Sequence, residues 1–187
     1  MNFAAIVLAA GKASRFGSDK LSAPFRGEPL LAHALRAARA APVSRVLLVC
    51  PPVFDTSHWP DLDVIRIASP ELSASLKAGI AAADDADGAF IFLGDMPLVP
   101  HSIATELAGV LGDNFAAVPR WQGKSGHPVL LSARAFPHIT LLTGDQGAGT
   151  MLKARKDVAF ASCEDEGVLL DIDRAEDIAR LENLGEA

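Results

Sequence analysis

The sequence has few cysteines, no long run of basic residues and no apolar segment long enough to cross a membrane. Cys50 and Cys163 lie far apart and fit neither a zinc-ligand spacing nor a secreted disulfide framework, so we expect two reduced core thiols. A formal charge of −6 without a basic run argues against a general nucleic-acid or membrane-surface binder. No apolar run approaches the roughly 20 residues that span a bilayer, and no basic leader precedes the first one, so we expect a cytoplasmic protein.

The sequence also lacks internal repeats, low-complexity tracts and Ser/Gly linkers. It has 187 residues, of which 50% are hydrophobic, enough to bury a full core. We therefore expect a single domain that covers residues 1–187.

Strand-like and helix-like segments alternate along the first two thirds of the chain. The predicted strands cover residues 3–9, 45–50, 63–68 and 89–94, and the predicted helices cover 30–41, 72–83 and 102–112. This rhythm predicts an α/β fold, a Rossmann-like three-layer α/β/α arrangement around a mainly parallel sheet. The last third is expected to add a mixed edge. Residues 115–119 and 127–132 flank a polar loop, residues 167–173 are predicted to form a last strand, and helices are predicted at 147–156 and 174–184.

The stretch VLAAGKASRFGSDKL, residues 7–21, follows the first predicted strand and carries glycines and cations. Ligands of open α/β sheets bind beyond the carboxyl ends of the strands. Gly11 and Gly17 can bring backbone amides against an oxyanion, while Arg15 and Lys20 can hold phosphate oxygens. The spacing matches neither a P-loop nor a dinucleotide-binding turn. The alternative is a solvated turn whose cations face water.

Carboxylates lie at the carboxyl ends of two of the predicted strands. Asp95 ends the buried run AFIFLG, and a carboxylate beside a phosphate site is a candidate Mg2+ ligand. The alternative is that Asp95 only ends the strand before Pro97. Asp171 and Asp173 would point to the same face of an extended segment, and one of them suffices for a metal. Asp173 with Glu176 also fits a helix cap.

LAAGKASRFGSDKL followed by EPLLAHAL resembles the signature of nucleotidyltransferases related to molybdenum cofactor cytidylyltransferase and guanylyltransferase. Further matches follow in order and extend over nearly the whole chain: SASLKAGI, GDMPLV, GHPVLL, GDQGA and DIDRAEDI. The resemblance implies condensation of a nucleoside triphosphate with a phosphorylated acceptor, molybdopterin by preference, with Mg2+ present and pyrophosphate released. A molybdoenzyme that receives the product is a further implied partner.

The resemblance also implies roles for individual residues. The catalytic residues would be Arg15, Lys20 and Asp95, and the metal ligands Asp95 and Asp173. The nucleotide would be bound by Leu8, Ala9, Ala10, Gly11, Arg15, Lys20, Ser75 and Asp95. The acceptor would be bound by His127 and Asp145. Ser75 could instead be a helix-start serine bonded to backbone, and His127 a structural hydrogen-bonding residue.

Three features of the sequence are ambiguous or depart from the family pattern; two bear on the substrates, and the third, Arg174, bears on the helix cap. Ala10 gives LAAG, as in the cytidylyltransferases, and favours CTP, whereas Asp19 before the loop lysine is more common on the guanylyltransferase side. Gly149 stands where the family often carries a cation, which leaves the acceptor open, and Arg174 replaces a common threonine. GTP is therefore the alternative nucleotide. A non-catalytic nucleotide or pterin carrier is a second alternative, and a nicotinamide oxidoreductase, which would need a G-x-G-x-x-G turn, ranks last.

Overall fold

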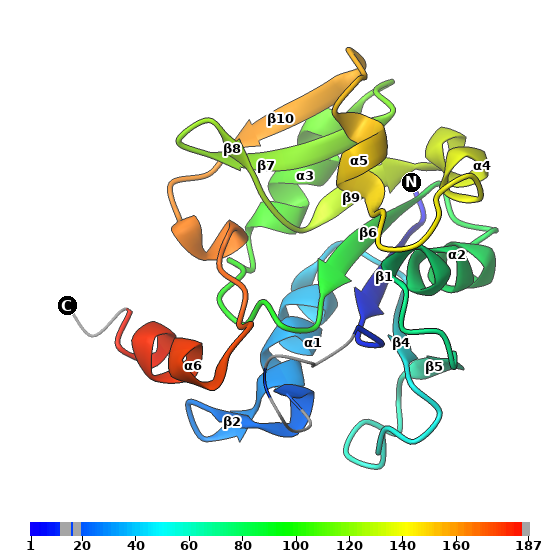
Figure 1. The fold of residues 1–187 in the computed structure, drawn as a ribbon. Helices are drawn as coiled ribbons and strands as arrows, with labels where there is room; N and C mark the ends of the chain where they lie inside the picture. Colours follow the sequence, from blue (N-terminus) through cyan, green and yellow to red (C-terminus); the bar gives the residue numbers. More distant parts are fainter. Residues whose placement is uncertain (12–15, 17–19, 185–187) are drawn as a thin grey trace.

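The computed structural model describes residues 1–11, 16 and 20–184 and contains a mainly parallel sheet between two helical layers (Figure 1). Within those residues, eight strands form one sheet whose main path runs β10-β7-β9-β6-β1-β4-β5. The strands are β1 (Phe3–Leu8), β4 (Arg45–Cys50), β5 (Asp63–Arg66), β6 (Gly88–Leu93), β7 (Ala116–Trp121), β8 (Lys124–Ser125), β9 (Val129–Ser132) and β10 (Val158–Ser162). The expected fold class is confirmed.

The sheet has a parallel half and a mixed half. Strands β6, β1, β4 and β5 are parallel neighbours, while β9 runs antiparallel to both β6 and β7, and β10 returns parallel to β7. The short β8 pairs antiparallel with β7. The mixed edge was therefore correctly expected, although sequence analysis did not identify β10.

Both faces of the sheet are buried at its central strands, as their continuous apolar sequences predict. Alternate residues of β1 point into two different clusters, Phe3, Ala5 and Val7 into one and Ala4, Ile6 and Leu8 into the other. The first cluster is covered by α1 (Leu30–Ala40) and α3 (Ile103–Leu111). The second is covered by α2 (Leu72–Ala82), α4 (Phe136–Ile139) and α5 (Ala148–Leu152).

A third, smaller cluster lies beside the carboxyl edge of the sheet. It joins the hairpin of β2 (Pro24–Phe25) and β3 (Glu28–Pro29) to α6 (Ala175–Glu182) through Phe25, Leu30, Ile172 and Leu181. The backbone N–H of Arg26 also donates to a Glu182 carboxylate oxygen at 2.7 Å. This packing places the end of the chain against the first part of the fold (Figure 1).

The strand expected at residues 167–173 is wrong. Glu166–Val168 form a 3-10 helix, η3, and the residues that follow belong to no strand. Single backbone hydrogen bonds attach this return segment, residues 168–173, to the sheet edge: His127 N–H to Val168 O and Ile172 N–H to Asp95 O. Its apolar residues pack in two places, Val168 and Leu169 in the first cluster and Leu170 and Ile172 in the third. None of them lies in a strand ladder, so the apolar run here indicates burial without strand pairing.

One cysteine lies where sequence analysis expects it and the other does not. Cys50 is buried and free, whereas Cys163 is free but partly exposed at the end of β10. Burial raises the pKa of both thiols. No helix in the described part of the chain is long and apolar enough to cross a membrane.

Candidate functional site

The candidate site forms where β1 and β6 end side by side. These strands are parallel neighbours with Leu8 opposite Leu93, so the segments that follow them leave from the same edge. The N–H of Gly94 donates to Leu8 O at 2.9 Å. A Cβ at position 94 would lie 3.2 Å from that oxygen and 3.1 Å from Leu31 Cδ1, so glycine allows the close approach that sets Asp95 beside the first loop.

An ion pair joins that first loop to the end of β6. Lys20, in the 3-10 helix η1 (Lys20–Ser22), places its Nζ 2.7 Å from Asp95 Oδ2 and 3.8 Å from Asp173 Oδ1. The Lys20 side chain is only 11% exposed, against 24% for Asp95 and 51% for Asp173. Three predicted site residues, 75 to 153 positions apart in sequence, therefore lie together.

Asp171 completes a group of three carboxylates, which we call the carboxylate cluster: Asp95, Asp171 and Asp173. One oxygen from each lies within 4.8 Å of the others. Burial, followed by the negative charges of Asp173 and Asp95, raises the pKa of Asp171, and Lys20 partly offsets this. Sequence analysis did not assign Asp171 to the metal, although the two-residue spacing places it on the same face as Asp173.

The chemistry of this donor set fits a hard divalent cation. Carboxylate oxygens are the ligands that magnesium prefers in proteins, usually one or two of them together with substrate phosphates. The capping interpretation of Asp173 is not supported, because Arg174 is the N-cap residue of α6. Asp177 accepts the backbone N–H groups of Arg174 and Asp173, at 2.8 and 3.1 Å.

The residues predicted to bind the nucleotide surround the same edge. Leu8, Ala9 and Ala10 are buried, and Gly11 is exposed with nothing near the position of an added Cβ. The Ala9 N–H donates to Val49 O at 2.8 Å, which fixes the start of the loop against β4. Arg15, Gly17 and Asp19 lie outside the described residues.

Ser75 lies in the first turns of α2 and is 2% exposed. Its hydroxyl donates to Glu71 O at 3.3 Å. This hydrogen bond is the one expected if Ser75 is a helix-start serine bonded to backbone. The neighbouring Ser73 N–H donates to Gly144 O at 3.1 Å. The turn that carries the exposed Asp145 is thereby held against the start of α2, and Gly144 adopts φ +57° there.

His127, one of the two predicted acceptor residues, lies close enough to Asp95 to interact with its charge. Its N–H donates to Val168 O at 2.8 Å, and its Nδ1–H donates to Ile91 O at 3.5 Å. Burial lowers its pKa, although the Ile91 hydrogen bond and the charge of Asp95 act in the opposite direction. In the described part of the chain no hydrogen bond or ion pair joins Asp145 to Lys20 or Asp95.

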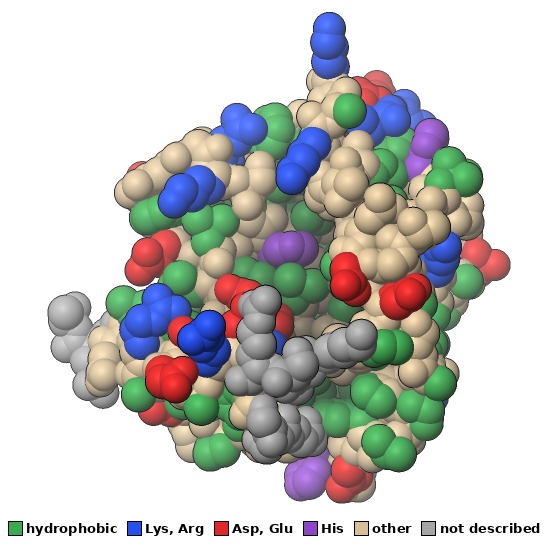
Figure 2. All heavy atoms as spheres, viewed as in Figure 1, with side chains coloured by type: hydrophobic (Ala, Val, Ile, Leu, Met, Phe, Trp, Pro, Cys, Tyr) green, Lys and Arg blue, Asp and Glu red, His purple; other side chains and the backbone are tan. Residues whose placement is uncertain are grey.

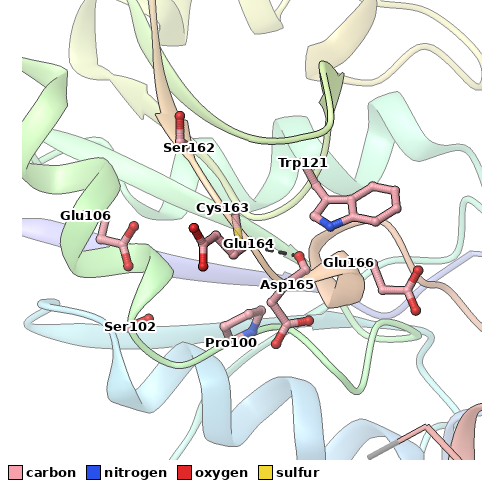
Figure 3. A pocket seen from close by; sticks show the side chains of 9 residues that line it. All are labelled: Pro100, Ser102, Glu106, Trp121, Ser162, Cys163, Glu164, Asp165 and Glu166. Atoms are coloured by element: carbon pink, nitrogen blue, oxygen red, sulfur yellow. Dashed lines mark hydrogen bonds between the residues drawn. The ribbon is translucent and has the colours of Figure 1, made fainter.

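The molecular surface has a hollow in the middle of the face shown in Figure 2, with acidic side chains on both sides of it. A separate open groove of about 820 Å³ lies between α3, the end of β7 and the residues after β10 (Figure 3). Its lining includes Trp121, Cys163 and four carboxylates, Glu106, Glu164, Asp165 and Glu166. The groove contains none of the predicted site residues, and its charge disfavours a phosphate.

With this geometry established, comparison with known proteins identifies the family. A model of the MobA-like NTP transferase domain matches residues 5–158. The chain belongs to this family. The MobA-like domain is a nucleotidyltransferase domain, so the resemblance stated from the motifs is confirmed at the level of the family and of the general reaction class.

Several known proteins align along most of the chain. The purine catabolism protein PucB of Bacillus subtilis is 31% identical over 92% of both chains. A probable molybdenum cofactor guanylyltransferase of Pyrococcus horikoshii is 28% identical over 88% of both. The structure of Rv0371c from Mycobacterium tuberculosis superposes with a TM-score of 0.87 at 26% identity, covering 97% and 98% of the two chains. Another structure of Rv0371c, in complex with manganese, superposes with a TM-score of 0.83 at 24% identity.

Proposed function

We propose that this protein transfers the nucleotidyl group of CTP to the phosphate of molybdopterin in a magnesium-dependent reaction that releases pyrophosphate. The observation that carries the proposal is the contact of Lys20 with Asp95 and Asp173 at the edge where β1 and β6 end. A triphosphate is strongly anionic, and only a site with cations can hold it beside these carboxylates. The lysine and a divalent cation together meet that requirement.

The carboxylate cluster would hold the Mg2+, with Asp95 and Asp173 as principal ligands and Asp171 beside them. The bound ion would supply charge neutralisation at the phosphates. Lys20 would contact the oxygens of the departing pyrophosphate, and Arg15 would hold them with its guanidinium. The acceptor phosphate oxygen attacks the α-phosphorus in line, the bond to the β-phosphate oxygen breaks, and pyrophosphate carries away the electron pair. No covalent intermediate with the protein is required.

Fewer residues support the proposed nucleotide and acceptor than support the metal and phosphate site. Ala10 is buried at the start of the loop, and we expect its methyl group to disfavour a purine base, so CTP is preferred to GTP. Ser75 would approach the ribose or base, while His127 and Asp145 would bind the acceptor. A molybdoenzyme would receive the product. Relatives named as molybdenum cofactor guanylyltransferases support the acceptor and keep GTP as the alternative nucleotide.

The deciding experiment is an incubation of purified protein with Mg2+, molybdopterin and each nucleoside triphosphate in turn, with pyrophosphate release measured. We expect release with CTP, less with GTP, and none without the acceptor or with excess chelator. Tight binding of nucleotide or pterin without pyrophosphate release from any triphosphate would support the non-catalytic carrier instead. A manganese complex of the relative Rv0371c makes Mn2+ a suitable second metal for this assay.

A further inference from the structure

The Lys20 ammonium pairs with two of the three carboxylates in the carboxylate cluster. Its Nζ is 2.7 Å from Asp95 Oδ2 and 3.8 Å from Asp173 Oδ1, and its side chain is almost fully buried. An ammonium at hydrogen-bond distance from a carboxylate neutralises that charge and blocks close approach to the bonded oxygen. A bare dication entering the cluster would meet a like charge a few ångströms away.

We propose that Lys20 keeps free divalent cations out of the carboxylate cluster and that the protein binds its metal together with the triphosphate. Nucleotide phosphates would draw the ammonium away from Asp95 and so make that carboxylate available to the ion. This inference rests on the proposed function for the metal site. Lys20 would then have two roles. It would bind phosphate, and it would select a metal–nucleotide complex over the metal alone.

The covalent structure of Lys20 suits such an exchange. Its backbone is fixed in η1, where Lys20 O accepts the N–H of Ala23 at 3.2 Å. The ammonium, however, is at the end of a flexible four-carbon side chain and is a compact point charge. The residue can therefore change partners from a carboxylate to a phosphate without a change in the fold around it.

The two roles of Lys20 predict opposite effects of one substitution. Lys20→Gln removes the charge and retains hydrogen bonding, and Lys20→Met removes both. Both variants should bind free Mn2+ about tenfold or more tightly than the wild type, since an opposite or like charge within 4–6 Å shifts an ionic equilibrium by that order. Both should bind a non-hydrolysable CTP analogue more weakly.

The measurement is a Mn2+ titration followed by electron paramagnetic resonance, with and without the CTP analogue. Lys124→Gln, which removes an exposed lysine on β8, is the matched control and should titrate as the wild type does. The analogue should strengthen Mn2+ binding to the wild type much more than to the Lys20 variants. Thermal unfolding of each variant establishes that it is folded.

Equal affinities of wild type and Lys20→Gln for free Mn2+ would overturn the inference. A tightening that persists in Lys20→Gln/Asp95→Asn would overturn it as well, because the ion would then be bound elsewhere. If Lys20→Met unfolds, Lys20→Gln alone decides. Chelator-sensitive pyrophosphate release by the wild type is measured separately, so a failure of this inference is distinguishable from a failure of the proposed function.

Discussion

The carboxylate cluster and the groove of Figure 3 are both acidic, but their carboxylates are arranged differently. In the cluster, carboxylates from the end of β6 and from the return segment converge around the ammonium of Lys20. The groove has four carboxylates around an open volume of about 820 Å³, and one of them, Asp165, accepts the N–H of Gly167 at 2.7 Å at the start of η3. Convergence of carboxylates around a cation, and not the number of acidic residues, distinguishes the candidate metal site from the groove.

Asp95→Asn should have the largest effect. The substitution keeps the shape of the side chain but removes a principal metal ligand, so we expect the rate of pyrophosphate release to fall on the order of a hundredfold or more. Glu164→Gln in the groove is the matched control and should retain the wild-type rate. Near-normal turnover of Asp95→Asn, or an equal loss in both variants, would remove the distinction between the two acidic regions.

Gly126→Ala should test how much the close contact between Gly126 and the return segment contributes to the free energy of unfolding. A Cβ at position 126 would collide with the carbonyl of Val168, and such overpacking costs about 1–3 kcal/mol in the free energy of unfolding. Gly109→Ala in α3 is the control, because nothing lies near its Cβ and alanine favours a helix. Urea unfolding measures both. If Gly126→Ala is as stable as Gly109→Ala, the close contact between Gly126 and Val168 does not contribute to the free energy of unfolding.

Much of the site could be expected from the sequence because its residues follow strongly apolar strands. Lys20 and Asp95 come directly after the β1 loop and β6, and parallel strands bring their carboxyl ends to one edge. Asp171 was not assigned as a metal ligand from the sequence. Its two-residue spacing from Asp173 places both side chains on one face, but it does not show how many of these carboxylates lie beside Asp95. Their segment was expected to be a strand because apolar periodicity reports burial but not the hydrogen-bond partner.

The edge strand β10 was not predicted because local sequence does not reveal the pairing of a partly exposed strand. Its burial is incomplete, with Phe160 44% exposed, so it lacks the continuous apolar character of β1 or β6. The Arg120 guanidinium lies 3.6 Å from the centroid of the Phe160 ring, and this cation–π contact depends on a pairing with β7 that local sequence does not reveal.

Ala10→Gly should have a smaller effect, on base choice. One methyl group is worth about 1–3 kcal/mol in discrimination, so the wild type should prefer CTP to GTP by roughly tenfold to a few hundredfold. The glycine variant should shift kcat/KM toward GTP, with molybdopterin as acceptor in both assays. A wild-type preference for GTP, or no shift in the variant, would contradict the role given to Ala10.

Asp171→Asn should have the smallest effect, a rise in the stability of the metal-free protein at neutral pH. The pKa of Asp171 is raised in the folded state, so its ionised form is disfavoured there relative to the unfolded chain. The gain should disappear as the pH falls below both the raised and the ordinary pKa, because the wild-type carboxyl is then neutral in both states. Thermal unfolding across this pH range measures the effect, and a stabilisation by Asp171→Asn that persists at acid pH would have another cause.

The proposed metal site is tested most directly by an anomalous difference map from crystals grown with Mn2+ and a non-hydrolysable CTP analogue. We expect one strong manganese peak among the carboxylates of Asp95, Asp171 and Asp173, with the Lys20 ammonium turned toward the phosphates. A peak in the groove beside Glu106 and Glu164, with none at the cluster, would contradict it.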